Sequence, residues 1–413
     1  MKAMTCENAA AGGNEWDRRG LPAWTYHSQA LLELEKSEIF RTHWQIAGHT
    51  SDIPRPGTYI TFDVADERAL VVRGDDGTVR AFHNLCRHRG SRVVADKAGH
   101  CKNAIVCPFH GWVYNFDGTL RGAARPNSFG KLDRGAFGLK PIELQIWRGF
   151  LFVRFSPGLQ PSVAKLMARF EDELAPYGME ALVPTKGFWE IQSPVNWKSV
   201  RDVDNEGYHV AMAHPALQDL YGANYRDEGY RDGTARSLGY YNPHAGRRWS
   251  VRHYAKLSAD NCTLPEDKRK LWGYYGLFPN AVIAVTPELI QFYQEIPLGV
   301  NRSLLRGAIY RNPQETRQQS AARYLATRID RETGKEDVQL TIWSNESMKS
   351  TAFEGFHLSD LEIAVRSHHD QLRQLLPIMT LDKAPPDQAI GEVNSSLRQL
   401  PDRLASDPQM RTS

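Results

Sequence analysis

The chain is poor in cysteine and has no long apolar stretch. Its 413 residues include five cysteines, too few for a disulfide framework. No run approaches the ~18 apolar residues that a membrane-spanning helix needs, and the first twenty residues lack the apolar core of a signal peptide. These absences predict a cytoplasmic protein with no membrane association.

Neither positive nor negative charge predominates in the chain. The 51 Lys and Arg residues nearly balance the 48 Asp and Glu residues, which leaves a formal net charge of +3. No basic run carries interleaved aromatic residues, so we expect no nucleic acid partner. The hydrophobic content of 41% and the length are instead those of a globular protein with room for two domains.

The spacing of apolar and turn residues distinguishes an N-terminal segment from a β region that follows it. Residues 1–44 contain an arm and then an amphipathic helix from about residue 29, because apolar residues recur there at helical spacing. Residues 45–157 change to short apolar segments separated by Gly, Pro and Asp turns, which predicts a small antiparallel β domain. The predicted strands are 58–64, 69–74, 79–84, 104–107, 113–116 and 150–155.

Residues 158–413 mix helices with strands. We predict a strand, a turn and one long helix over 188–217, strands and polar turns over 218–345, and a helix over 359–376. The polar tail after Pro386 is expected to be loosely attached. The predicted fold class is therefore α+β, with an all-β N-terminal domain before an antiparallel sheet flanked by helices.

Two motifs in the β region each offer one thiolate and one imidazole. They are Cys86-x-His88 and Cys107-x-x-His110, with Gly and Pro beside the turns. Such a set can hold a tetrahedral zinc ion, or a [2Fe–2S] cluster with both Cys on one iron and both His on the other. Zinc sites typically pair their cysteines closely, so the mixed order favours the cluster. Cys101, between the motifs, is interpreted as a small half-buried residue.

A second metal site is indicated in the C-terminal region. His209 and His214 are five residues apart, and an α-helix turns about 100° per residue. Both therefore reach one ion only if the helix is distorted or ends there, and Pro215 is consistent with such an end. Asp202 and Glu206 precede His209 at helical spacing. A His pair by itself is commonly two unrelated histidines.

These motifs resemble those of the Rieske non-haem iron oxygenases. CRHRG (86–90) and CPFHGWVYNFDGTL (107–120) are similar to that family's cluster motif. Its mononuclear-iron motif is similar to NWK (196–198), Asp202, Asn205-Glu206 and Tyr208-His209 with His214. The resemblance covers about residues 35–375.

The resemblance implies a domain organisation and two cofactors. It implies a Rieske [2Fe–2S] domain at 45–157, held to its cluster by Cys86, His88, Cys107 and His110. Residues 158–413 would form a helix-grip-like catalytic domain with a mononuclear Fe(II), and residues 1–44 would pack on that domain.

In the resembled family a late carboxylate completes a two-His-one-carboxylate triad, which leaves positions open for O2 and substrate. The family places it at the start of a helix, so Asp360 is the predicted third ligand beside His209 and His214, with Glu362 and Asp370 as competitors. The family's Glu-x-x-Gln pattern beyond the ligand is missing here, and Arg366-Ser367-His368 stands in its place.

By the same resemblance, Glu206 is the acid that bridges an iron ligand of one subunit to a Rieske histidine of its neighbour. A carboxylate bonded to both imidazoles would orient them and couple the centres. Asp202 and Asn205 are predicted to support the ligands from behind. The implied assembly is a head-to-tail homotrimer.

The implied reaction is O2-dependent hydroxylation or oxidative N-demethylation of a small organic substrate. The chain has no Gly-x-Gly-x-x-Gly motif after a strand and no four-cysteine run for a plant-type cluster. Electrons should therefore come from a separate NAD(P)H-dependent reductase, with or without a ferredoxin.

Two substrate classes stay open. Glu at the bridging position is similar to the branch that acts on carnitine, glycine betaine and stachydrine, although that branch usually has Glu-Cys-Tyr-His where this chain has Gly207. Aromatic side chains of the C-terminal region could form a cage for a quaternary cation, or could simply pack in the sheet core. The alternative is ring hydroxylation of an aromatic acid. The aromatic residues are Trp249, Tyr254, Trp272, Tyr274, Tyr275, Phe278, Tyr293 and Trp343.

Two other classes of protein are also compatible with these motifs. A Rieske electron carrier would need the four cluster ligands but not the second metal site, and a zinc-stapled binding module would need neither cluster nor iron. Basic residues near the cluster motifs are either a solvated face or a docking surface for an acidic electron donor. They are Arg87, Arg89, Arg92, Lys97 and Lys102.

Overall fold

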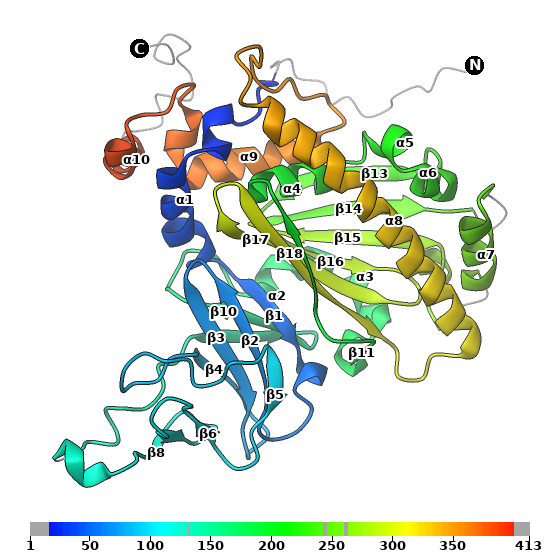
Figure 1. Ribbon diagram of the computed structural model, residues 1–413. Coiled ribbons are helices and arrows are strands. Elements are labelled where there is room, and N and C mark those ends of the chain that lie inside the picture. The colour runs from blue at the N-terminus through cyan, green and yellow to red at the C-terminus, as the bar shows by residue number, and fades with distance from the viewer. Residues whose placement is uncertain (1–15, 131, 243–245, 260–262, 400–413) are drawn as a thin grey trace, which may run out of the picture.

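The computed structural model describes residues 16–130, 132–242, 246–259 and 263–399 (Figure 1). Cys6, Cys262 and the start of the N-terminal arm lie outside these residues. Among the described helices, none combines the length and the apolar character that a membrane crossing requires.

Three small antiparallel sheets form the β region, at the lower left of Figure 1. The six predicted strands are confirmed, with ends displaced by no more than two residues. The sheets are β1 (Gln45–His49), β10 (Phe150–Arg154) and β9 (Glu143–Trp147); β4 (Val79–His83), β3 (Glu67–Arg73), β2 (Thr58–Val64) and β5 (Ala98–His100); and β6 (Ile105–Val106), β7 (Val113–Tyr114) and β8 (Leu120–Gly122).

One large antiparallel sheet dominates the C-terminal region. Its strand order is β11-β18-β17-β16-β15-β14-β13, and β12 pairs with β18. The fold is therefore α+β as predicted, whereas the predicted boundaries after residues 44 and 157 stay a prediction. The strands are β11 (Val183–Pro184), β12 (Trp189–Ser193), β13 (Tyr225–Arg231), β14 (Thr234–Tyr240), β15 (Leu271–Leu277), β16 (Ala281–Val285), β17 (Ile290–Gly299) and β18 (Arg302–Arg311).

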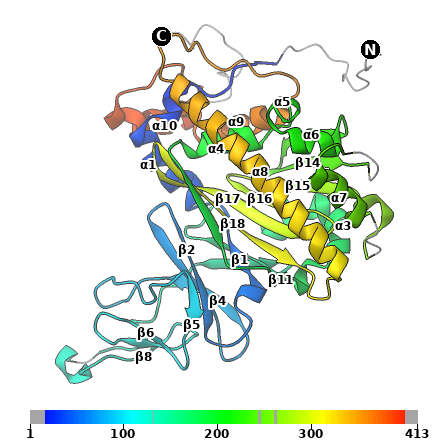
Figure 2. The ribbon, with the colours of Figure 1, turned by 45° about the vertical axis from the view of Figure 1, so that its right-hand side comes forward.

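A long helix, α8 (Arg317–Ser347), crosses one face of this sheet (Figures 1 and 2). The prediction of strands and turns up to residue 345 is wrong here. The side chains of Thr316 and Gln319 cap each other's backbone N–H groups at its start. Its buried face repeats at helical spacing, through Ala322, Leu325, Ala326 and Ile329.

The single long helix predicted before residue 217 is broken into three. They are α4 (Trp197–Asp204), α5 (Val210–Ala213) and α6 (Pro215–Tyr221). Asn196 caps α4 by accepting a hydrogen bond from the Lys198 N–H, and Pro215 occupies the first turn of α6, where its missing N–H costs nothing. The breaks fall beside the two histidines of interest.

The remaining helices flank the sheet and the β region. The helix predicted from residue 29 is confirmed, with a π-helical turn (Lys36–Phe40) at its end, and so is the one predicted over 359–376. The tail is not loose as far as it is described, because α10 buries Ile390 in the core. The helices are α1 (Gln29–Glu35), α2 (Val163–Leu166), α3 (Glu171–Leu174), α7 (Trp249–Ser258), α9 (Ile363–Leu375) and α10 (Ile390–Gln399).

Short 3-10 turns complete the described chain: Ala23–Tyr26, Thr50–Asp52, Pro126–Phe129, Ala168–Phe170, Ala175–Tyr177, Met179–Ala181, Glu266–Lys268, Pro377–Thr380 and Asp387–Ala389.

A buried ion pair joins the N-terminal helix to α4. Lys198 Nζ lies 2.5 Å from Glu35 Oε1, and Trp197 Nε1 donates to Glu35 Oε2 at 2.8 Å. The Glu35 and Lys198 side chains are both fully excluded from solvent. The charges are thus satisfied by each other, and the N-terminal segment is bound to the helix that precedes both histidines.

Replacing Lys198 with Met should lower the free energy of unfolding by about 3–5 kcal/mol, because it leaves the Glu35 carboxylate buried without a counter-charge. Chemical denaturation followed by tryptophan fluorescence measures this. The double variant Glu35→Leu/Lys198→Met should recover most of the loss; additive losses from the two substitutions would contradict the pairing.

Candidate metal centres

The two Cys/His motifs lie on two loops that fold alike. One loop follows β4 and the other connects β6 to β7. In each, a glycine N–H donates to the cysteine carbonyl four residues earlier, Gly90 to Cys86 and Gly111 to Cys107, both at 3.0 Å. Both glycines have positive φ, +75° and +66°, which other residues rarely adopt.

These loops place sulfur inside and imidazole outside. Cys86 and Cys107 are buried in one apolar cluster, and their thiols interact with each other. The rings of His88 and His110 lie farther out, 4.7 Å apart, and His110 is exposed. His88 Nδ1 is buried without a hydrogen-bond partner in the described chain.

The arrangement suits a [2Fe–2S] cluster. Burial raises the pKa of Cys86, so its thiolate gains stability from a bound metal. An inner pair of thiols and an outer pair of imidazoles match a cluster with unlike ligands on its two irons.

Tyr114 supports the Cys86 sulfur from β7. Its hydroxyl accepts a hydrogen bond from the Arg87 N–H at 2.9 Å and lies 3.3 Å from Cys86 Sγ. Because the oxygen already accepts the backbone N–H, its own proton is directed at the sulfur.

Three ligand atoms converge at a second site. His209 Nε2 and His214 Nε2 are 2.9 Å apart, and Asp337 Oδ1 lies 2.9 Å from the His214 atom and 3.4 Å from the His209 atom. Metal–ligand bonds of about 2.1 Å at right angles would separate neighbouring ligands by about 3.0 Å. Asp337 Oδ1 is buried and makes no hydrogen bond of acceptable geometry within the described chain. The set fits one face of an iron coordination sphere.

Local structure explains how histidines five residues apart can meet. α5 is a single turn, with His209 immediately before it and His214 immediately after it. His214 adopts φ −117° and ψ 77°, so the chain changes direction there before α6. The prediction that the helix must end at this point is confirmed.

Each imidazole is oriented by a carboxylate on its other nitrogen. Glu206 Oε1 bonds to His209 Nδ1, and Glu206 Oε2 accepts the His209 backbone N–H at 3.0 Å. Glu336 Oε2 lies 2.9 Å from His214 Nδ1. With Nδ1 engaged, Nε2 of each ring is directed toward the common point, the usual arrangement around metal-binding histidines.

The charges at this site shift its pKa values. Burial lowers the pKa of His209, but the adjacent carboxylates of Asp337 and Glu206 more than offset this and raise it to about 10. The pKa of His214 is raised against burial by Asp337 and Glu336. Asp337 has a lowered pKa, because both histidines outweigh its burial. Metal binding here must therefore release protons.

The structure contradicts the choice of Asp360 as third ligand. Its carboxylate is exposed and accepts hydrogen bonds from Trp16 Nε1 at 2.8 Å and from Arg18 at 3.1 Å. Neither competitor joins the histidines: Glu362 accepts the Ser359 N–H, and Asp370 pairs with Arg373. The carboxylate at the histidines is that of Asp337.

Asp202 and Asn205 do not support the ligands as predicted. Asp202 Oδ1 is 2.9 Å from His369 Nε2, and Tyr26 donates to Asp202 Oδ2 at 2.5 Å, so this acid joins α4 to α9 and the N-terminal segment. The Asn205 side chain accepts a hydrogen bond from Tyr230 at 3.4 Å. The hydrogen-bond partners of both residues therefore do not include His209 or His214.

Two family profiles match the chain where these sites lie. The Rieske [2Fe–2S] domain matches residues 43–133, and the ring hydroxylating alpha subunit (catalytic domain) matches residues 183–378. Together they span more than half of the sequence. The chain belongs to the Rieske oxygenase alpha subunits.

Individual relatives of this Rieske oxygenase subunit are quaternary-ammonium enzymes. The glycine betaine monooxygenase oxygenase subunit of Chromohalobacter salexigens is 37% identical over 57% of this chain and 53% of its own. The carnitine monooxygenase oxygenase subunit of Escherichia coli is 27% identical over 70% of this chain and 74% of its own. The match thus spans about half the length of the glycine betaine relatives.

Solved structures share the fold. A quaternary ammonium Rieske monooxygenase superposes with a TM-score of 0.72 at 23% identity, covering 86% of this chain and 95% of its own. Naphthalene 1,2-dioxygenase with bound indole gives 0.70 at 18% identity, covering 92% and 97%. The architecture alone therefore does not distinguish the two substrate classes.

One departure of this Rieske oxygenase from the Glu-Cys-Tyr-His pattern has a structural reason. A Cβ built on Gly207 would lie 2.0 Å from Cε1 of Tyr225, so the ring of Tyr225 fills the space of a side chain at position 207. The Gly207 N–H also donates to Asp227 at 2.8 Å. The loop that carries Glu206 is therefore held against β13 without a side chain at its centre.

Changing Asp337 to Asn should remove most of the mononuclear iron, because it removes the anionic ligand. Iron should fall from about three to about two per chain, with two sulfides retained, measured by metal and sulfide analysis. Asp360→Asn is the matched control and should keep all three; a loss of iron in that variant instead would reverse the assignment.

Changing Tyr114 to Phe should lower the reduction potential of the cluster. Removing one hydrogen bond of about 1 kcal/mol to a ligand sulfur corresponds to about 40 mV for one electron. Potentiometric titration followed by EPR measures the shift. An unchanged potential would show that the hydroxyl does not bond to the sulfur.

Proposed function

We propose that this protein is the oxygenase component of a Rieske monooxygenase system that oxidises a small quaternary ammonium compound. The observation that carries the proposal is the convergence of ligand atoms from His209, His214 and Asp337. The glycine betaine and carnitine relatives supply the substrate class.

Named residues would hold both cofactors. Cys86, Cys107, His88 and His110 would hold the [2Fe–2S] cluster, and the three convergent residues would hold Fe(II). When bound, the cluster passes single electrons and the iron activates O2 for attack on a C–H bond. Glu206 and Glu336 engage Nδ1 of the two imidazoles, which fixes the rings in orientation and leaves Nε2 of each for the iron.

The two centres require a neighbouring subunit. The cluster loops and α5 lie at opposite ends of the chain in both views (Figures 1 and 2). Apolar side chains are exposed beside each centre: Phe109 at 53% next to His110, and Tyr208 at 58% and Met212 at 89% around His209. Such patches mark surfaces that a partner covers.

We infer a head-to-tail ring, a trimer by resemblance, in which the cluster face of one copy covers the α5 face of the next. Glu206 would then bond to His209 of its own chain and to a cluster histidine of the neighbour. The electrons would enter from a separate NAD(P)H-dependent reductase.

Some of the eight aromatic residues that could form a substrate cage pack in the core instead. Fewer of them are therefore candidates for contact with a substrate. Tyr254, Trp272, Tyr275 and Phe278 belong to buried core clusters. Trp249 and Trp343 are exposed, at 57% and 58%. Tyr274 on β15 and Tyr293 on β17 pack in a small cluster with Val282 and Ala284 of the intervening strand β16.

The basic residues near the cluster are largely paired within the chain, which weakens their use as a docking surface. Arg92 donates to Asp63 at 2.7 Å, Arg87 to the Gly138 carbonyl at 3.1 Å, and Lys97 to Glu190. Docking of the donor here stays a prediction.

The test uses iron-loaded protein with a reductase, NADH and O2. Glycine betaine or carnitine should be consumed with release of formaldehyde or a hydroxylated product, and Glu206→Gln should slow this about 10- to 100-fold with iron and sulfide unchanged. Consumption of an aromatic acid instead would favour ring hydroxylation. About two iron per chain and no O2 consumption with any substrate would leave an electron carrier.

A further inference from the structure

Residues 121–140, which follow the second cluster motif, form a basic segment. They include five Lys and Arg residues and one Asp, a formal charge of +4, whereas the whole chain carries +3. Positive charge is therefore concentrated in this segment, and the rest of the chain is close to neutral. The turn Pro126–Phe129 projects beyond β8 at the lower left of Figure 1. The described basic residues of the segment are all exposed: Arg121, Arg125, Arg134 and Lys140.

The charges of this basic segment are not neutralised by acids of the described chain. None of the described carboxylates forms an ion pair with these four residues, whereas Arg92, elsewhere in the β region, pairs with Asp63 at 2.7 Å. Asp133, the acid of the segment, accepts the Gly135 N–H at 2.9 Å instead. The segment therefore presents a net positive surface to solvent.

Aromatic packing places the basic segment against the cluster site. The Trp112 ring stacks on the His88 ring, with centroids 5.2 Å apart and an interplanar angle of 5°. Phe129 lies edge-on to both rings, at centroid distances of 5.5 Å from His88 and 5.6 Å from Trp112. Phe137 lies edge-on to Trp112 as well, at 5.8 Å. A protein that binds to the segment would therefore lie next to an outer ligand of the cluster.

Further contacts hold the end of the basic segment to the cluster loops. Arg87, next to Cys86 in the sequence, donates to the Gly138 carbonyl at 3.1 Å. Leu139 is buried in the same apolar cluster as Cys86 and Cys107. The position of the segment is thus coupled to the position of the cluster ligands.

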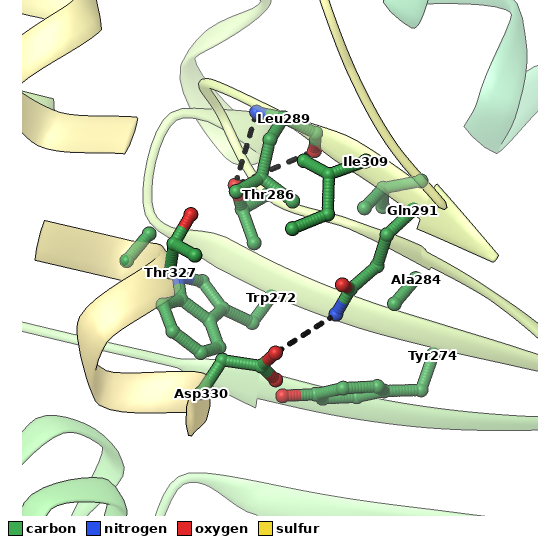
Figure 3. Close-up of a pocket in the computed structure, with 11 residues that line it drawn as sticks. Trp272, Tyr274, Ala284, Thr286, Leu289, Gln291, Ile309, Thr327 and Asp330 are labelled. Carbon is green, nitrogen blue, oxygen red and sulfur yellow. Dashed lines mark hydrogen bonds between the residues drawn. The ribbon is translucent and has the colours of Figure 1, made fainter. Parts of the chain in front are cut away.

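A groove beside the basic segment has room for side chains of a partner. It lies between β4, residues 117–120 and residues 134–144, and its empty volume is about 1150 Å³, part of it open to solvent. The hollow between the large sheet and α8 is much smaller, about 290 Å³, and Asp330 in its wall accepts a hydrogen bond from Gln291 at 3.3 Å (Figure 3). Phe129, 37% exposed, adds an apolar contact to the basic surface. Aromatic and arginine side chains are enriched in protein interfaces.

The two cluster histidines have different surroundings. His110 is exposed, whereas Phe129 and Trp112 contact the ring of His88. A cluster that passes electrons onward needs an entry route as well as an exit route. In the proposed ring the exit leads to the neighbouring copy, for which His110 is accessible. The entry route then falls on the side that the basic segment covers.

We propose that Arg125, Phe129 and Arg134 form the docking surface of an acidic electron-donor protein. This assignment rests on the proposed function, which requires a separate donor. Carboxylates of the donor would meet the arginines, which raises the rate of encounter, and contact with Phe129 would bring the donor close to His88. One electron then leaves the reduced donor and reduces the cluster, with no bond made or broken.

The test uses the full chain loaded with cluster and iron, and a plant-type [2Fe–2S] ferredoxin, a small acidic protein, as the donor. Calorimetry measures the dissociation constant of the oxidised ferredoxin, and stopped-flow spectroscopy measures reduction of the cluster by the reduced ferredoxin. Arg125→Glu/Arg134→Glu reverses the charge of the surface, and Arg125→Lys/Arg134→Lys keeps it. The control Arg302→Glu/Arg317→Glu reverses two exposed arginines of the C-terminal region. Iron and sulfide analysis shows that each variant carries its cluster.

At about 10 mM salt, Arg125→Glu/Arg134→Glu should weaken ferredoxin binding and slow cluster reduction about tenfold or more. The difference should shrink to about twofold at about 1 M salt, where charges interact only over about 3 Å. The lysine variant and the control should behave as wild type. Reduction by dithionite, which needs no docking surface, should be unchanged in every variant.

Wild-type affinity and rate in Arg125→Glu/Arg134→Glu, or no reduction of the wild-type cluster by ferredoxin, would overturn the docking surface. A smaller oligomer in that variant, measured by light scattering, would mean that the basic segment contacts a second copy, which also overturns it. Cluster reduction needs no substrate. Failure to oxidise any quaternary ammonium compound would therefore refute the proposed function and leave this test intact.

Discussion

Both imidazoles of the mononuclear site depend on carboxylates that engage their Nδ1 atoms. Glu206 and Glu336 come from different elements, yet each fixes a ring so that Nε2 meets Asp337 Oδ1 within 2.9–3.4 Å. Three acids around two histidines would be an unfavourable accumulation of negative charge without a cation. The site therefore gains stability when a metal replaces the protons that now satisfy it.

For these contacts to form, two parts of the chain that are far apart in sequence must be held in a fixed relative position. The break between α4 and α6 supplies the histidines, and α8 supplies Glu336 and Asp337. The buried Lys198–Glu35 pair binds the N-terminal segment to α4, while Ser199 and Asn196 bond to Asn345 near the end of α8. The polar contacts across these elements fix the orientation that apolar packing alone would leave variable.

The sequence predicted most reliably what is local. Each cluster motif is a short loop closed by a glycine at positive φ, so its residues lie together in space as they do in sequence. Asp337 is different, because it joins His209 only through the fold, and the strands and turns predicted over 218–345 do not include the helix that carries it. The signals of α8 were present: Thr316 and Gln319 form a capping box, and Ala322, Leu325, Ala326 and Ile329 follow at helical spacing. The resemblance to the family's late carboxylate indicates Asp360 instead, because it rests on position near the chain end and not on contacts made by the fold.

The same helix explains how one turn can serve both histidines. Glu336 and Asp337 are consecutive residues of α8, and successive side chains on a helix point about 100° apart. Glu336 can therefore engage Nδ1 of His214 while Asp337 Oδ1 lies beside Nε2 of both rings. A loop would let these positions vary, whereas a capped helix packed on the sheet and on α7 holds both carboxylates in place.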